Sequence, residues 1–92
     1  MTGRIETYIH SDSITQNKGG AMVKVVCDTD FAAKVAVFKS FCAAAAKYSF
    51  AADSTDWKKV IFVFPRVEEM RISLQDELKE KVTVEEIVIL KL

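Results

Sequence analysis

One stretch of ten residues decides how this chain folds: Val23-Lys24-Val25-Val26-Cys27-Asp28-Thr29-Asp30-Phe31-Ala32. Its first half alternates in side-chain character, which predicts a strand with one covered face. Asp28 and Thr29 can each cap a helix that begins immediately afterwards, because their side-chain oxygens accept from free amides of the first helical turn. Asp30 adds negative charge at the positive end of the helix dipole. The stretch therefore predicts a strand that leads directly into a helix.

Phe31 lies in the opening turn of this helix, and spacing alone leaves its direction open. The ring either folds back onto the sheet or projects from the rim of the domain, where it would be available to a partner. The helix is predicted over Thr29–Lys47, and its apolar stripe has the spacing i, i+4, i+7, i+11 and i+14. That stripe comprises Phe31, Val35, Phe38, Cys42 and Ala45. Membership of the stripe favours a core position for Phe31.

Length and composition indicate one domain over residues 1–92. Half of the residues are hydrophobic, which is enough for a core and too many for a disordered chain. Thirteen basic residues balance thirteen acidic ones, so no overall charge attracts nucleic acid or anionic lipid. The apolar runs are shorter than the roughly 18 to 20 residues of a membrane span. Because no basic segment followed by an apolar one begins the sequence, we expect a cytoplasmic protein.

Two strands, several helices and a final strand are expected along the chain. Trp57–Phe64 has the β-branched and aromatic content of a strand, but its helical apolar face and the following Pro65 favour a short helix. The other predicted segments are a strand over Gly3–His10, a connection over Ser11–Gly20 that ends in a glycine turn, a strand over Ala21–Cys27, a loop over Ala51–Thr55, a helix over Pro65–Lys79 and a strand over Val82–Leu92. This order predicts an α+β fold of two layers.

The sequence shows no arrangement typical of a catalytic or metal site. Cys27 and Cys42 have neither a redox nor a zinc spacing, and we expect two buried thiols. His10, the single histidine, is expected to be a strand-end residue. The acidic pairs Glu68-Glu69 and Glu85-Glu86 are adjacent in sequence, so each pair should diverge. We therefore predict no catalytic residue, no cofactor and no metal, and a binding function instead of an enzymatic one.

Two separated blocks of the sequence match one family in register. They are Gly3-Arg4-Ile5-Glu6 followed by Tyr8-Ile9-His10, and Gly20–Val25 followed by Cys27–Ala32. Together they resemble the core (dimerisation) subdomain of translation elongation factor Ts, which typically has G-R-I-E-x-Y-I-H and then G-V-L-V-E-V-N-C-E-T-D-F-V-A. A looser similarity covers Glu77–Val84, where the family usually has a K-I-G-E-K-I stretch.

The resemblance implies both a fold and a function. The family's subdomain has a three-stranded antiparallel sheet with helices on one face, in the order strand, strand, helices, strand. The family binds elongation factor Tu and promotes release of GDP, and an Asp-Phe pair is inserted near the magnesium and phosphate site of Tu. That pair corresponds to Asp30 and Phe31, and the implied partner-binding residues are Asp28, Thr29, Asp30, Phe31 and Ala32. The resemblance thus favours an exposed Phe31.

The sequence also departs from the family. Val26, Asp28 and Ala32 replace the usual Asn, Glu and Val, and the N-terminal helical module, the second core repeat and the helical insertion have no counterpart. This reduced single-domain form would bind Tu weakly, form a homodimer that replaces the second repeat, or act through another assembly. Two alternatives to an exchange factor stay open: a Tu-binding decoy or subunit without exchange activity, and an unrelated homodimerising α+β module with an exposed sheet edge. Direct binding to nucleic acid or a membrane is not expected.

Overall fold

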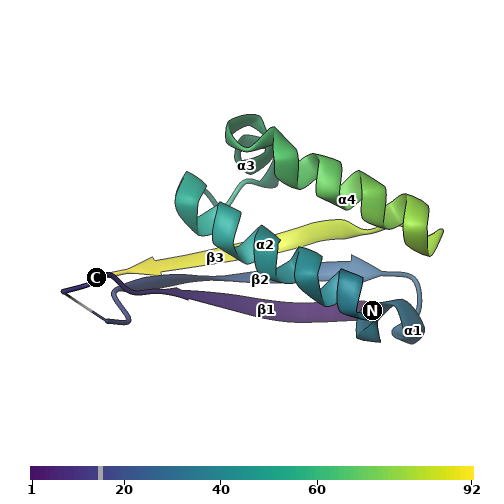
Figure 1. Ribbon diagram of the computed structural model, residues 1–92, viewed down its shortest axis with the longest axis horizontal. Helices are drawn as coiled ribbons and strands as arrows, with labels where there is room; N and C mark the ends of the chain where they lie inside the picture. Colours follow the sequence, from purple (N-terminus) through teal and green to yellow (C-terminus); the bar gives the residue numbers. More distant parts are fainter. Residues whose placement is uncertain (15) are drawn as a thin grey trace.

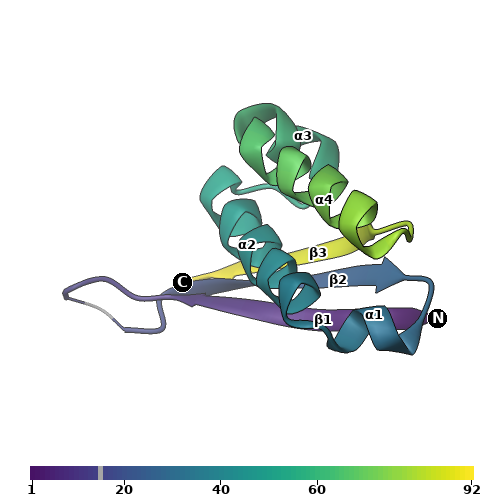
Figure 2. The same ribbon diagram turned by 45° about the vertical axis from the view of Figure 1, so that its right-hand side comes forward.

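The computed structural model of the chain describes residues 1–14 and 16–92. Within them, two strands are followed by four helices and a last strand: β1 (Thr2–His10), β2 (Gly19–Cys27), α1 (Asp30–Lys34), α2 (Ala36–Ala52), α3 (Trp57–Val63), α4 (Pro65–Leu78) and β3 (Thr83–Lys91). The strands form one antiparallel sheet in the order β1-β2-β3, and the helices lie on one side of it (Figures 1 and 2). The predicted α+β class with a three-stranded antiparallel sheet is confirmed.

The core lies between the central strand β2 and the long helix α2. Alternate residues of β2 face the helices and are buried, as the sequence predicted: Ala21, Val23, Val25 and Cys27. From α2, the buried side chains are Phe38, Phe41, Cys42, Ala45, Ala46 and Ser49. The small side chains on α2 allow its backbone to lie close to the sheet, while Phe38 fills the space between them. Both cysteines are free and buried, which confirms their predicted environment.

The predicted single helix over Thr29–Lys47 is wrong, because the chain leaves the helical conformation at Val35. This residue is extended, with φ −78° and ψ 150°, and it separates α1 from α2. Neither proline nor glycine marks the break; a β-branched residue such as valine only weakly disfavours helix. The break changes the direction of the chain so that Ala32 and Phe38 are both buried. A continuous helix would instead have placed Phe31 in line with Phe38.

The end of α2 also differs from the prediction. The helix continues through Ala52, beyond the predicted end at Lys47 and into the predicted loop Ala51–Thr55. Asp53 ends it in the left-handed conformation, with φ 53°. A single left-handed residue of this kind commonly terminates a helix. The high helix propensity of the alanine-rich segment therefore persists until a suitable capping residue appears.

The glycine pair that was predicted to form a turn belongs to β2. The predicted connection over Ser11–Gly20 includes position 15, which lies outside the described residues, and it ends before Gly19. A Cβ atom on Gly20 would lie 2.7 Å from the carbonyl oxygen of Tyr8, and one on Gly19 would lie 3.0 Å from the ring of Phe50. The glycines therefore permit close packing beside β1 and α2, while Asn17, with φ 53°, has the left-handed conformation.

The remaining elements follow the sequence closely. The predicted short helix over Trp57–Phe64 is confirmed as α3, and the carboxylate of Asp56 caps it by accepting from the Lys58 amide at 3.0 Å. Pro65 begins α4, as expected of a residue without an amide hydrogen. The predicted last strand is confirmed as β3. None of the described helices combines the length and apolar character that a membrane crossing requires.

A bulge in β3 brings together two carboxylates that were expected to diverge. The register between β2 and β3 shifts between Lys24 and Val25, so that Glu86 is opposite Lys24 and Val84 is opposite Val25. The carboxylates of Glu85 and Glu86 then lie 3.2 and 3.4 Å from the Lys24 ammonium. The hydrogen bond that the Lys24 ammonium donates to Glu85, followed by the one that it donates to Glu86, raises the pKa of Lys24. Neighbouring side chains of a regular strand point to opposite faces, but at this bulge Glu85 and Glu86 both contact Lys24.

Polar side chains of α4 fix the beginning of β3. Gln75 Oε1 accepts from the Val82 amide at 2.8 Å and from Arg71 Nη1 at 2.9 Å, and the same Arg71 nitrogen donates to the Val82 carbonyl at 2.9 Å. Glu68 forms an ion pair with Arg71, which lies three residues later on the same face of α4. Both backbone groups of the fully buried Val82 are therefore satisfied by α4, and the turn from α4 to β3 is held in place.

We predict that Gln75→Leu lowers the free energy of unfolding by about 1 to 3 kcal/mol, because it leaves the buried amide of Val82 without an acceptor. Urea unfolding followed by circular dichroism measures the change. Gln75→Glu is the matched control, since it keeps an acceptor for the amide and for Arg71. If both variants lost the same stability, the amide contact would not be the cause.

Candidate partner-binding surface

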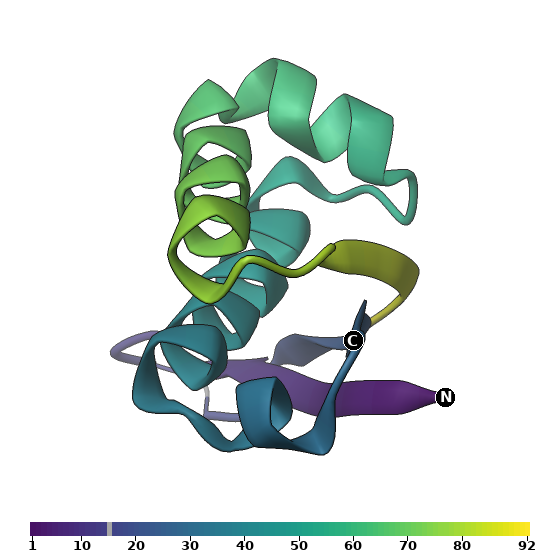
Figure 3. The ribbon, with the colours of Figure 1, turned by 90° about the vertical axis from the view of Figure 1, so that its right-hand side faces the viewer.

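The junction between β2 and α1 positions most of the predicted site residues. Thr29 is the N-cap of α1: its backbone is extended, with φ −131° and ψ 151°, and its hydroxyl accepts from the Ala32 amide at 3.2 Å. Of the two predicted capping residues, Thr29 therefore fills the role. Asp30 lies in the first turn, where its charge favours the helix dipole. Figure 3 views the molecule from the end where α1 lies.

Phe31 projects away from the core, and 77% of its surface is exposed. Asp28, Thr29 and Asp30 are also exposed, so four of the five predicted partner-binding residues share one rim of the domain. The expected exposure of Phe31 is confirmed, and the core position favoured by the helical stripe is wrong. The reason is the break at Val35, which removes Phe31 from the face that contains Phe38.

Ala32 does not belong to this exposed rim. Only 1% of its surface is exposed, and it packs in the core with residues of β2 and α2. Its predicted direct contact with a partner is therefore corrected: the side chain anchors α1 to the domain. A five-residue helix has little stability of its own, so a buried contact of this kind is needed to hold it. The buried Ala32 thus fixes the short helix on which the exposed Phe31 lies.

A carboxylate from a distant part of the chain holds the β2–α1 junction. Glu80, in the turn between α4 and β3, accepts through Oε1 from the amides of Asp28 and Thr29, at 3.0 and 3.1 Å. Its Oε2 accepts from the Thr29 hydroxyl at 2.5 Å. In return, Asp28 Oδ2 accepts from the Lys81 amide at 3.2 Å. We call this reciprocal set of four hydrogen bonds the junction latch.

The electrostatics of the junction latch follow from these contacts. The hydrogen bond from the Thr29 hydroxyl, supported by those from the Asp28 and Thr29 amides, lowers the pKa of Glu80 below its ordinary value. A carboxyl whose pKa is lowered by folding stabilises the folded state above its ordinary pKa, and this contribution is lost as the pH falls through the lower value. Burial raises the pKa of the nearby Cys27 thiol, and the Asp28, Asp30 and Glu80 charges act in the same direction. The junction is thus an acidic rim around Phe31.

Sequence reasoning did not assign a role to Glu80 or Lys81. Asp28 and Glu80, which the junction latch joins, are 52 residues apart in the sequence, and no local pattern connects them. The one available signal was the looser family similarity over Glu77–Val84, which contains both residues without indicating their contact. Tertiary structure was required because the latch depends on where α4 ends against the sheet.

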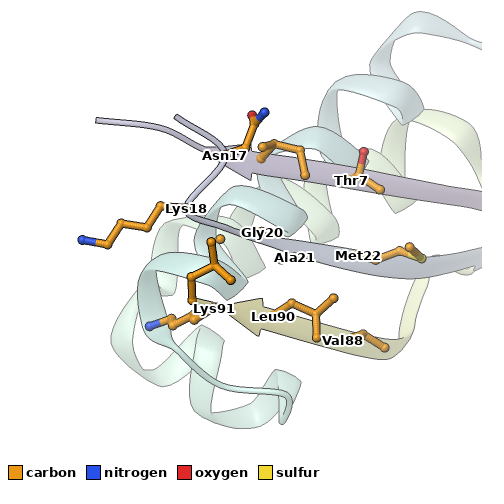
Figure 4. Close-up of a pocket in the computed structure, with 12 residues that line it drawn as sticks. Thr7, Asn17, Lys18, Gly20, Ala21, Met22, Val88, Leu90 and Lys91 are labelled. Atoms are coloured by element: carbon orange, nitrogen blue, oxygen red, sulfur yellow. The ribbon is translucent and has the colours of Figure 1, made fainter. Parts of the chain in front are cut away.

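A second exposed surface lies on the side of the sheet opposite the helices, and we call it the open sheet face. Its large apolar side chains are Ile5, Ile9, Met22, Val88 and Leu90. At one end they border a groove of about 640 Å³, to which Thr7, Met22 and Leu90 contribute from three adjacent strands (Figure 4). The Lys24 ion pairs with Glu85 and Glu86 lie on the same sheet.

The polarity of β1 is unusual for a sheet covered on one side. Arg4 and Glu6 alternate with Ile5 and are the less exposed residues. Burial raises the pKa of the Cys42 thiol of α2 to about 12, while the Arg4 charge lowers this pKa and the Glu6 charge raises it. His10 ends the strand, accepts or donates a hydrogen bond with Tyr8 at 2.9 Å and stacks on Phe50. Its expected position at a strand end is confirmed. Polar side chains of β1 therefore approach the helices, while Ile5 and Ile9 face the open side.

Across 1–14 and 16–92, no group of three or more histidine, cysteine, aspartate or glutamate side chains is arranged to hold a metal ion. Glu68 forms an ion pair with Arg71 of the same helix, and the divergence expected of Glu68 and Glu69 stays a prediction. No protein-family model matches the chain, and no curated protein matches it either. The rim around Phe31 and the open sheet face both expose large apolar side chains, which makes them candidate binding surfaces.

We predict that Phe31→Ala leaves the free energy of unfolding within about 0.5 kcal/mol of the unmodified chain, because the ring is largely exposed. Phe38→Ala, a matched removal of a fully buried ring, should cost about 3 to 5 kcal/mol. Thermal and urea unfolding of the two variants measure the difference. A loss of several kcal/mol in the Phe31 variant would show that this ring is structural.

Proposed function

We propose that this chain is an elongation factor Ts-like protein that binds elongation factor Tu and promotes release of GDP. The proposal assigns partner contact to Asp28, Thr29, Asp30 and Phe31, and it includes no catalytic residue, cofactor or direct contact with nucleic acid. A cytoplasmic location follows from this function, because Tu acts there. The balance of acidic and basic residues agrees with a protein partner in preference to RNA.

One observation carries the proposal: a large aromatic ring is held in solvent by a folded support. Phe31 is exposed, while the next residue, Ala32, is buried and Thr29 caps the same short helix. Burying an exposed aromatic side chain against a partner is a common source of interface energy. The negative charges of the neighbouring Asp28 and Asp30 would favour the approach of this rim to a site that contains cations. These features match what the family resemblance implies for an Asp-Phe pair.

The proposed mechanism is thermodynamic linkage between the factor and the nucleotide. A protein that binds nucleotide-free Tu more tightly than GDP-bound Tu must lower the affinity of Tu for GDP by the same ratio. Phe31 would act as a wedge. Together with the Asp30 carboxylate, it would displace the elements of Tu that hold the magnesium ion. Asp30 also stabilises the α1 dipole, so its two roles are separable by experiment.

We predict that this chain binds Tu more weakly when GDP and magnesium are in excess than when they are removed. Isothermal titration calorimetry gives both affinities, and release of labelled GDP gives the exchange rate. Phe31→Ala should weaken binding by about 30-fold or more, the equivalent of about 2 kcal/mol for an interface anchor. Val63→Ala, an exposed apolar truncation on α3, is the matched control. Equal affinities with and without nucleotide would exclude the exchange mechanism.

A Tu-binding decoy or subunit is the first alternative. It would use the same Phe31 rim but bind both nucleotide states equally, and therefore leave GDP release unchanged. The rim geometry is compatible with both functions, because it describes contact and not the coupling between binding and nucleotide affinity. The labelled-GDP experiment separates them, since a decoy forms the complex without accelerating release.

The open sheet face favours a second partner, which is another copy of this chain. The face combines Ile5, Ile9, Met22, Val88 and Leu90, and 74% of the Leu90 surface is exposed. Apolar patches of this kind mark interaction sites in soluble domains. Two such sheets can stack face to face about 10 Å apart, with their inner side chains interdigitating. Such a homodimer would join two copies of the domain through their open sheet faces.

Stacking of faces is favoured over pairing of sheet edges. β3 is an edge strand of the sheet. Its bulge and the Glu85 and Glu86 charges interrupt the regular ladder that a second chain would need. Bulges and charges at an edge are common protections against edge-to-edge association. The exposed apolar side chains of β3, Val88 and Leu90, lie on the open sheet face and are available for stacking.

We predict that the chain is in a monomer–dimer equilibrium and that Leu90→Lys shifts it to monomer, because the substitution places an unpaired ammonium in an apolar interface. Sedimentation equilibrium at tens of micromolar protein measures the mass. Val63→Lys, an equivalent substitution on the exposed side of α3, should leave the dimer intact. A purely monomeric unmodified chain at these concentrations would contradict the homodimer.

A further inference from the structure

The junction latch joins two turns that are distant in sequence. The β2–α1 junction contributes two amides and one hydroxyl, and a single carboxylate, that of Glu80, accepts from all three. The Lys81 amide returns one hydrogen bond to Asp28. Charged acceptors form stronger hydrogen bonds than neutral ones, and several donors converging on one carboxylate restrict its geometry. The position of α1 is therefore determined from the α4–β3 turn as well as from the core.

The Thr29 hydroxyl transmits this constraint to the helix. It donates its hydrogen to Glu80 and accepts from the Ala32 amide, so its donor and one acceptor site are both used. Without the Glu80 carboxylate, the Thr29 hydroxyl could rotate, and the amides of Asp28 and Thr29 would lose their acceptor. The five-residue α1 would then depend more on the packing of Ala32 and Ala33 against the core, because a helix this short is not stable by itself.

We propose that Glu80 is a positioning residue for the partner-binding rim: it orders Asp28 and Thr29 so that Phe31 is presented in its bound arrangement before contact. This inference rests on the proposed binding of Tu for its functional consequence, although the ordering itself belongs to the free chain. Glu80 acts through Thr29 and needs no contact with the partner. Ordering a contact segment in advance raises affinity, because less conformational freedom is lost on binding.

The test is a double-mutant cycle with Glu80→Gln and Thr29→Val, measured as affinity for nucleotide-free Tu. Glu80→Gln removes the charge and one acceptor, and it should weaken binding about 10-fold, the equivalent of one charge-assisted hydrogen bond. Thr29→Val removes the hydroxyl at constant shape. The double variant should bind no more weakly than the weaker single variant, because both substitutions break the same contact. Glu77→Gln, an exposed carboxylate at the end of α4, is the matched control.

Amide hydrogen exchange of the free chain tests the ordering without Tu. Glu80→Gln should accelerate exchange at Asp28 and Thr29 by about 10-fold, while the amides of the β2 interior keep their protection. Unchanged protection at both amides would overturn the inference whatever the binding result. Additive losses in the cycle, or wild-type affinity of Glu80→Gln, would overturn it as well. Failure of the unmodified chain to bind Tu, together with accelerated exchange in the variant, would instead refute the proposed function and retain the ordering.

Discussion

The contact between α2 and the central strand β2 is the constraint on which the rest of the structure depends. The described helices all lie on one face of the sheet, and the core therefore forms between that face and the longest helix (Figure 1). Fully buried Val23 and Val25 meet Phe38 and Cys42 there. Because α2 must lie with its small residues against the sheet, the chain that precedes it has to turn before α2 begins. The break at Val35 is the consequence.

That break separates two residues that sequence periodicity would have placed together. Phe38 enters the core, whereas Phe31 lies on a short helix whose buried residue is Ala32. The exposed ring is thus a product of core packing and not of local preference. A single helical turn carrying an exposed aromatic would be poorly ordered without support, and Glu80 supplies that support from the other end of the chain. Two separate parts of the fold, α1 and the α4–β3 turn, form hydrogen bonds with Thr29 at this rim.

The one-sided arrangement of helices has a second consequence on the opposite side of the sheet. β1 directs Ile5 and Ile9 outward, so the open sheet face is apolar where a solvated face would normally be polar. The rim and the open sheet face belong to different surfaces of the domain, and an exchange factor that dimerises could use both at once. In that assembly two copies would present two Phe31 rims, while the stacked sheets formed the centre. The two proposals therefore support a single architecture.

Local chemistry in the sequence was sufficient for the strands, the α3 helix and the class of the fold. Alternation in Val23–Cys27, the capping chemistry of Asp28 and Thr29, and Pro65 at a helix start each act over a few residues, and each could be predicted. The α1–α2 break, the Glu85–Glu86 bulge and the junction latch depend on contacts between segments far apart in the chain. Periodicity placed Phe31 in a stripe because it assumes one continuous helix, and only packing against the sheet showed that the helix ends at Lys34. The sequence by itself thus determined the strands, α3 and α4, while the tertiary structure decided where α1 ends and which side chains remain exposed, because both depend on how elements pack against one another.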